Sequence, residues 1–187
     1  MGGPVELLSA ACTVVLVLVF GAAVVGKVRT AASLSAFTDA VVVLGRVPTR
    51  RAGAAAKGVI ALEAATGLLL LVPPLRGAGL LLATVLLAAF TAVVARALRS
   101  RVPVSCRCFG GSAGPLGPPQ LIRNAVLLLV VVGAAPGVLD PGRLVWQAQF
   151  TAWLAGAVAA LVLVTGEELI ALLRRPTVHA TQATDLA

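Results

Sequence analysis

Two of the three cysteines, Cys106 and Cys108, stand one residue apart in a glycine- and proline-rich segment between long apolar runs. Arg107 lies between them, and a neighbouring cation favours the thiolate, so we expect a lowered thiol pKa. The thiolate is the species that attacks a disulfide, and a bridge across one residue closes a strained ring that is easily reduced. Cys106 and Cys108 are therefore candidate catalytic residues for thiol–disulfide exchange, with Arg107 in support.

Other interpretations of the thiols were weighed. A metal site is not predicted, because two cysteines without a second pair or a nearby histidine cannot complete a tetrahedral zinc shell. The single histidine, His179, lies in the C-terminal tail and is not expected to act in catalysis or metal binding. An inert or lipidated pair at the membrane edge remains an alternative. Cys12 lies within an apolar run, where a lone thiol is usually a small apolar filler.

The composition indicates an integral membrane protein. Of the 187 residues, 59% are hydrophobic and 12% are charged, against roughly 25% charged residues in a soluble domain. The apolar runs are continuous over about 20 residues, which favours membrane-spanning helices over the alternating strands of a barrel. The net charge of +8 comes from basic residues placed between these runs. There they report membrane orientation, so nucleic acid is not an expected partner.

The elements that must position the cysteines are five predicted transmembrane helices, and the fold class is an all-α membrane bundle. A short helix within residues 28–52 is expected to lie on the membrane surface. The cysteines occupy a long loop over residues 99–119, and the tail over residues 176–187 is predicted to be disordered and cytoplasmic. The spans are predicted at residues 7–26, 53–72, 77–98, 120–139 and 145–173.

Glu63 is the one acidic residue expected deep inside a span, about 15 Å from the entry of the second helix and near the bilayer middle. A central carboxylate costs about 2.5–3.5 kcal/mol on insertion scales, so it should face the bundle interior and have a partner. Two interpretations stay open. Glu63 either shuttles protons or is a hydrogen-bonded packing contact between helices.

The basic residues predict the orientation. With the N-terminus outside, thirteen of the fifteen lysines and arginines face the cytoplasm, and only Arg76 and Arg143 face outward. This asymmetry is typical of a multi-pass plasma-membrane protein with a cytoplasmic C-terminus. It also places the cysteine pair at the cytoplasmic edge.

Several short motifs occur along the chain in a characteristic order. They are Gly26-Lys27-Val28, Phe37, Leu44-Gly45-Arg46-Val47-Pro48, Glu63 with Gly67-Leu68-Leu69-Leu70, Cys106-Arg107-Cys108-Phe109-Gly110, and Arg123-Asn124 at the start of the fourth span. Over roughly residues 7–135, the chain resembles the MauE family of methylamine-utilisation membrane proteins, which are related to the DoxX-like group.

The resemblance implies a DoxX-like four-helix domain over residues 1–139, with an additional transmembrane helix over residues 140–175. It implies Arg123 and Asn124 as supporting site residues. It also implies a thioredoxin-like partner of the MauD type and an exported client protein that acquires disulfides. For MauE proper that client is the methylamine dehydrogenase small subunit. No cofactor is predicted: the DoxX relationship suggests a quinone, but no quinone-binding pattern is found.

The leading hypothesis is a membrane thiol-redox component that supports disulfide formation or maturation of an exported protein. A conflict accompanies it, because the client is outside whereas the charges place the cysteines inside, so a moving loop or an electron carrier is needed. A non-redox assembly or export factor would keep its function after loss of both thiols. A small-molecule transporter would instead depend on Glu63.

Overall fold

The computed structural model describes residues 3–100, 118–139 and 146–173. These ranges are almost wholly helical and contain no strand. The predicted all-α membrane bundle with five spans is thereby confirmed. Cys106, Arg107, Cys108 and the tail over residues 176–187 lie outside the described residues. The helical stretches long and apolar enough to cross a membrane are Pro4–Val28, Thr49–Leu71, Pro73–Arg99, Pro119–Leu139 and Trp146–Gly166.

The helices follow the predicted order with modest shifts at their ends. The connection between the second and third spans is a single 3-10 turn, as expected for a Pro-Pro sequence, which cannot supply the amide donors of a longer helix. The elements are α1 (Pro4–Val28), α2 (Ala31–Gly45), α3 (Thr49–Leu71), η1 (Pro73–Leu75), α4 (Arg76–Arg99), α5 (Pro118–Ala134), α6 (Pro136–Leu139) and α7 (Trp146–Leu173).

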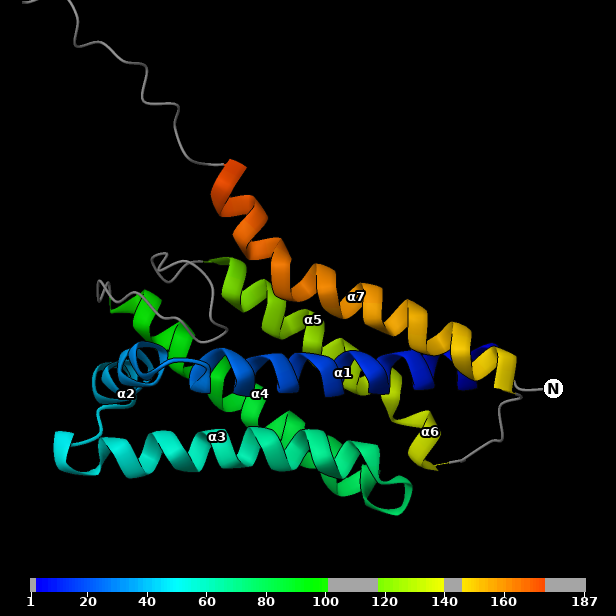
Figure 1. Ribbon diagram of the computed structural model, residues 1–187, viewed down its shortest axis with the longest axis horizontal. Helices are drawn as coiled ribbons and strands as arrows, with labels where there is room; N and C mark the ends of the chain where they lie inside the picture. The colour runs from blue at the N-terminus through cyan, green and yellow to red at the C-terminus, as the bar shows by residue number, and fades with distance from the viewer. Residues whose placement is uncertain (1–2, 101–117, 140–145, 174–187) are drawn as a thin grey trace, which may run out of the picture.

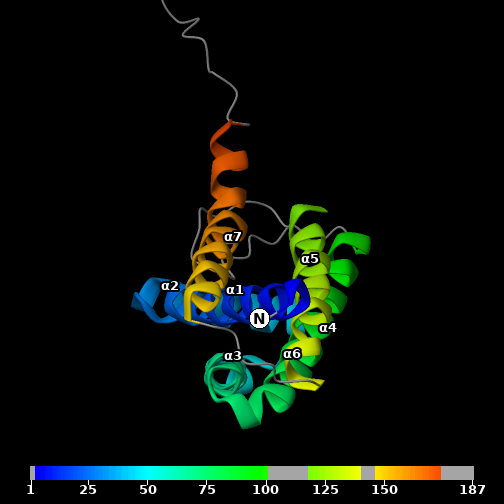
Figure 2. The same ribbon diagram turned by 90° about the vertical axis from the view of Figure 1, so that its right-hand side faces the viewer.

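α1 is the central helix of the bundle (Figure 1). It runs antiparallel to α3 and α5, while α4 and α7 run in its own direction. In the end-on view of Figure 2, α7 lies on one side of α1 and α4 and α5 lie on the other. α7 packs mainly along α1, and its C-terminal end stands away from the bundle. The division into a four-helix domain over residues 1–139 and an added helix over residues 140–175 stays a prediction.

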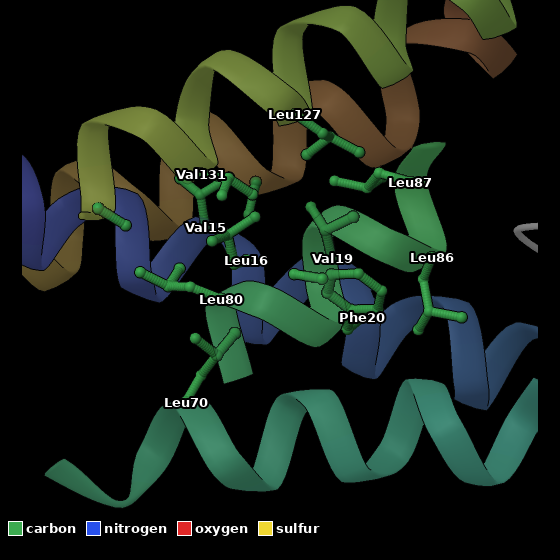
Figure 3. Close-up of a cluster of buried hydrophobic side chains, with 13 residues drawn as sticks. Val15, Leu16, Val19, Phe20, Leu70, Leu80, Leu86, Leu87, Leu127 and Val131 are labelled. Atoms are coloured by element: carbon green, nitrogen blue, oxygen red, sulfur yellow. The ribbon is translucent and has the colours of Figure 1, made fainter. Parts of the chain in front are cut away.

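The core lies where α1, α4 and α5 meet, with one side chain each from α3 and α7 (Figure 3). Leucine, valine and phenylalanine fill it, whereas other large apolar side chains point outward, such as Leu81 at 68% and Leu129 at 71% exposure. Lipid is as apolar as these side chains, so helix association depends on close packing rather than on water exclusion. The labelled core residues are Val15, Leu16, Val19, Phe20, Leu70, Leu80, Leu86, Leu87, Leu127 and Val131.

Small residues bring α1 close to its neighbours. A Cβ added to Gly133 of α5 would lie 2.8 Å from the Cys12 Sγ atom, and one added to Gly156 of α7 would lie 2.6 Å from the Ala11 carbonyl oxygen. Neither site has room for a methyl group without a shift of its neighbour. Glycine at these two positions therefore sets how closely α5 and α7 approach α1.

The fourth span is broken near its end, where a single helix over residues 120–139 was predicted. α5 stops at Ala134 and α6 begins at Pro136, because proline lacks the amide that would continue the helical ladder. The buried Ser9 hydroxyl of α1 donates to the Ala134 carbonyl and accepts from the Gly137 amide, both at 2.9 Å. Ser9 thus supplies hydrogen-bond partners at the break, which lipid cannot do.

α2 crosses the end of the bundle where α1 ends and α3 begins (Figure 1). Thr30 caps its start by accepting the Ser33 amide, and Arg46 follows its last residue in a left-handed conformation with φ 53°. One apolar side of α2 faces the bundle: Phe37 is buried, and Leu34 and Val41 are half-buried. The short helix is confirmed, and its position on the membrane surface stays a prediction.

Candidate functional site

Two ionisable side chains, Lys27 of α1 and Glu63 of α3, lie on the helix faces that point into the bundle. On α1 the buried positions include Leu16, Phe20, Ala23 and Lys27, which recur every three or four residues along one face. On α3 the buried positions are Ala52, Ala56, Glu63, Thr66 and Leu70, and most follow the same spacing. Lys27 and Glu63 therefore occupy positions that apolar residues fill elsewhere on their helices.

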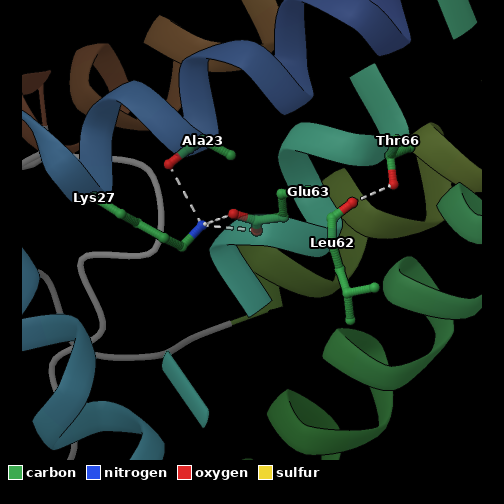
Figure 4. A network of polar contacts seen from close by, with 5 residues as sticks. All are labelled: Ala23, Lys27, Leu62, Glu63 and Thr66. Carbon is green, nitrogen blue, oxygen red and sulfur yellow. Dashed lines mark hydrogen bonds and ion pairs between the residues drawn. The ribbon is translucent and has the colours of Figure 1, made fainter. Parts of the chain in front are cut away.

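Lys27 and Glu63 form a buried ion pair between α1 and α3 (Figure 4). The Lys27 Nζ atom lies 2.8 Å from both the Oε1 and Oε2 atoms of Glu63. Both side chains are 1% exposed. The same Nζ atom lies 3.5 Å from the Ala23 carbonyl oxygen and 5.0 Å from the centre of the Phe37 ring. The ammonium of α1 is thus held by a carboxylate from α3 and an aromatic face from α2.

Lys27 and Glu63 stabilise the bundle only when both side chains are present. The attraction between two buried charges is largely offset by the cost of removing both from water. Loss of one partner leaves an uncompensated charge, which typically costs about 3–5 kcal/mol. The Phe37 ring adds a cation–π contact, worth about 2 kcal/mol where the cation is desolvated. The predicted interior position of Glu63 with a partner is therefore confirmed, while its proposed proton-shuttling role stays a prediction.

The start of α5 adds two more buried polar side chains. Arg123 is 8% and Asn124 is 4% exposed, and they begin the buried face that continues through Leu127, Val131 and Ala134. The positive charge of Arg123 is close enough to Lys27 to repel it. Lys27 of α1 therefore interacts with charged groups from two other helices, Glu63 of α3 and Arg123 of α5. Two of these three groups are positive.

The predicted catalytic pair, Cys106 and Cys108, lies outside the described residues, as does Arg107. The helix ends that bracket this segment are described: α4 ends at Arg99 and α5 begins at Pro118. Both ends lie at the end of the bundle where α1 joins α2 (Figure 1). Lys27 is the penultimate residue of α1, so the cysteine segment is attached at the end of the bundle that also holds the ion pair.

Cys12 occupies a different part of the bundle. It is half-buried on α1, against Gly133 of α5. Fifteen residues separate it from Lys27, which is about 22 Å along a helix. This environment agrees with the prediction of a small packing residue. Within the ranges that the structure describes, no cluster of three or more histidine, cysteine or acidic side chains could hold a metal ion.

Comparison with known families decides the identity. The sequence profile of the family described as methylamine utilisation protein MauE matches residues 5–137 of the 187. The chain belongs to the MauE family. The predicted resemblance over roughly residues 7–135 is confirmed, and membership indicates a methylamine-utilisation membrane protein. No curated protein and no solved structure matches the chain significantly.

The MauE match contains every predicted site residue, because Glu63, the cysteine pair, Arg123 and Asn124 all fall within residues 5–137. α7 lies outside the match. Within the described part of the MauE region, the fold brings Glu63 and the start of α5 into one buried polar cluster around Lys27. We call this group of Lys27, Glu63, Arg123 and Asn124 the buried polar cluster.

Lys27 is the residue that sequence reasoning missed. It was counted with the basic residues that mark the cytoplasmic edge, whereas the structure buries it against Glu63. A signal was available, since Lys27 stands four residues after Ala23 on the apolar face of its helix, and Glu63 required a partner. The number of basic residues on each side of the membrane does not show which face of a helix each residue occupies.

Proposed function

We propose that this MauE-family protein is a multi-pass membrane thiol-redox component that exchanges disulfides with a thioredoxin-like partner. It would thereby support maturation of an exported protein. The observation that carries the proposal is the Cys-Arg-Cys segment between α4 and α5 in a chain of the MauE family. Support comes from the buried polar cluster at the end of the bundle where this segment is attached.

The exchange has two steps. The thiolate of one cysteine attacks the partner's disulfide, forms a mixed disulfide and releases one partner thiolate. The second cysteine then attacks the mixed disulfide, which closes the Cys106–Cys108 bridge and releases the partner as a dithiol. Two electrons pass to the partner, whose two thiolates take up protons. The same steps run backwards when the Cys106–Cys108 bridge is a stronger oxidant than the partner's disulfide.

In this proposal the charged residues have separate tasks. Arg107 favours the thiolate of its neighbours, because a cation stabilises the charged form. Arg123 and Asn124 fix the start of α5, to which the cysteine segment is joined. Lys27 and Glu63 hold the adjoining helices together and form a pair that can exchange a proton. Because Lys27 already neutralises Glu63, the acid offers no unpaired charge to a transported ion, which weighs against a transporter.

The proposal is tested with the full chain in nanodiscs, and the probe is an oxidised thioredoxin-fold protein of high reduction potential, because a strained bridge is too easily reduced for the pair to reduce thioredoxin itself. The reduced protein should reduce the disulfide of this probe and acquire an internal bridge between Cys106 and Cys108, seen by mass spectrometry after alkylation. Cys106→Ser and Cys108→Ser should abolish turnover, and one of them should accumulate a mixed disulfide. Cys12→Ser is the matched control and should react as the wild type does.

An equal rate in the wild type and both serine variants would reject the redox proposal. If those variants also support maturation of exported disulfide proteins in cells, the non-redox assembly factor becomes the better explanation.

A further inference from the structure

A shallow pocket lies between the C-terminal ends of α2 and α4, away from the buried polar cluster. It is lined by Val43, Leu44, Arg46, Arg96, Ala97 and Ser100. The pocket is an open site with a cavity volume of about 30 Å³. Sites that enclose drug-sized ligands usually hold about 300–1,000 Å³, so this pocket suits one small group of a ligand that lies at the surface.

Two guanidinium groups and a hydroxyl form the polar part of the pocket. Arg96 is exposed, and its Nη2 atom donates to the Leu44 carbonyl at 2.6 Å. This bond fixes the guanidinium at the pocket and leaves its other N–H groups as donors. The Arg46 side chain is exposed and forms no hydrogen bond or ion pair with the described residues. Ser100 adds a hydroxyl that can donate one more hydrogen bond.

The backbone at Arg46 is unusual for its residue type. Arg46 has φ 53°, and it is the one non-glycine residue with positive φ among those that the structure describes. Glycine is the usual residue at this position after a helix, because a Cβ atom disfavours the left-handed conformation. An arginine that keeps this unfavourable backbone conformation beside a pocket suggests that its side chain has a function there.

The charges around the pocket favour an anion. Arg50, Arg51 and Arg99 are exposed at the same end of the bundle. Asp39, one helical turn before Val43, forms no ion pair with the arginines of the described ranges. The other side of the pocket is apolar, with Val43 49% exposed and Ala97 buried. A ligand that fits both sides is anionic at one end and apolar at the other.

We propose that this pocket binds the phosphate group of an anionic phospholipid, with Arg46 and Arg96 as its ligands. Arginine recognises phosphate through parallel N–H donors. The pocket lies where the apolar span α4 ends in exposed arginines, which is the level expected for headgroups. Val43 and Leu44 would contact the glycerol and the first acyl carbons. Basic pockets of this kind between transmembrane helices are a known mode of lipid recognition.

The test uses the full chain in neutral detergent, with phosphatidylglycerol as the probe and phosphatidylcholine as the zwitterionic comparison. Native mass spectrometry reports how many lipids stay bound and with what apparent affinity. The Arg46→Gln/Arg96→Gln variant should bind phosphatidylglycerol at least about tenfold more weakly, because it loses both guanidinium donors. Its affinity for phosphatidylcholine should be nearly unchanged.

Two controls separate the pocket from general attraction and from misfolding. Arg50→Gln/Arg51→Gln removes the same charge from the same end of the bundle but not from the pocket, and it should weaken binding less than about threefold. Arg46→Gly removes one ligand while supplying the residue that the left-handed backbone prefers. It should therefore lower affinity for phosphatidylglycerol with no loss of thermal stability.

Equal losses in the two double variants would show diffuse attraction and overturn the proposal, as would full binding by Arg46→Gln/Arg96→Gln. Inorganic phosphate is tested in the same way. If it binds as tightly as the lipid and depends equally on Arg46 and Arg96, the pocket is a free-phosphate site and the lipid assignment is wrong.

Discussion

At the scale of single residues, the Lys27–Glu63 pair is the feature that most constrains this bundle. The Lys27 Nζ atom contacts the Ala23 carbonyl oxygen and both oxygens of the Glu63 carboxylate. The aromatic face of Phe37 covers the same ammonium at 5.0 Å. Arg123 adds a second positive charge that acts on Lys27. The cluster is therefore unsymmetrical, with one acid and two cations.

This asymmetry predicts unequal costs for the two single substitutions. Glu63→Gln leaves Lys27 and Arg123 as like charges and should lower the free energy of unfolding by about 3–5 kcal/mol. Lys27→Met should cost less, because a lone buried carboxylate can take up a proton and become neutral. Reversible unfolding in mixed micelles, followed by circular dichroism, measures both values.

The double variant Lys27→Met/Glu63→Leu is the control for this prediction. Replacement of a buried pair by apolar side chains of similar size is often neutral or stabilising. The double variant should therefore be more stable than Glu63→Gln alone. A double variant that is no more stable than Glu63→Gln would contradict this prediction.

At the scale of helices, α1 is held at the centre of the bundle by closely packed contacts with its neighbours. Gly133 and Gly156 allow α5 and α7 to pack closely against α1. Ser9 of α1 hydrogen-bonds to backbone groups at the break between α5 and α6. The contacts at the two glycines differ in kind. Gly133 faces the end of a side chain, Cys12 Sγ, whereas Gly156 faces a backbone atom, the Ala11 carbonyl oxygen.

Because Gly133 faces a side chain and Gly156 faces the backbone, we expect a second substitution to restore stability only at Gly133. Gly133→Ala and Gly156→Ala should each destabilise the bundle by about 1–3 kcal/mol, the usual cost of overpacking. Adding Cys12→Ala should recover most of the Gly133→Ala loss, because it removes the clashing sulfur. The same change should not help Gly156→Ala. Unfolding in micelles again provides the measurement.

Gly67→Ala serves as the matched helical control. A Cβ atom at Gly67 of α3 meets nothing within 4 Å. The substitution should be neutral or stabilise the protein by up to about 1 kcal/mol through the helix propensity of alanine. Loss of stability there, equal to that at Gly133, would argue against close packing as the cause.

At the scale of the whole molecule, the bundle has two unlike ends. At one end, exposed cations flank α2 at Arg29 and Arg46 and occur at the start of α3 and the end of α4. At the other end, η1 and α6 connect the spans with short turns. The distribution of lysine and arginine predicts that the basic end is cytoplasmic. That orientation bears on the redox proposal, because the segment with Cys106 and Cys108 leaves from the basic end.

Cysteine reporters test the orientation. In a Cys12→Ala/Cys106→Ser/Cys108→Ser background, Leu75→Cys in η1 should react with a membrane-impermeant maleimide in intact cells. Ser100→Cys at the end of α4 should react only in inverted vesicles, since both residues are exposed but lie at opposite ends. The reverse labelling pattern would show that the N-terminus is cytoplasmic. It would also remove the conflict with an exported client.

The sequence by itself determined that the protein lies in a lipid bilayer, how many times it spans the bilayer, and which family it belongs to. Membrane-length apolar runs are local properties of the chain, and the motifs from Gly26 to Asn124 are matched by the family profile over residues 5–137. It also predicted that Glu63 needs a partner, because a buried carboxylate is costly wherever its helix lies. The roles of Cys106 and Cys108 stay predictions.

Only the tertiary structure decided that Lys27 is that partner, that Ser9 serves the break before Pro136, and that α7 packs along α1. Each of these facts depends on how far one helix is rotated and shifted against another. A rotation of one residue, about 100° on a helix, moves a side chain from the core to the lipid. Hydropathy along the chain contains no record of that angle, which is set by packing at positions such as Gly133 and Gly156.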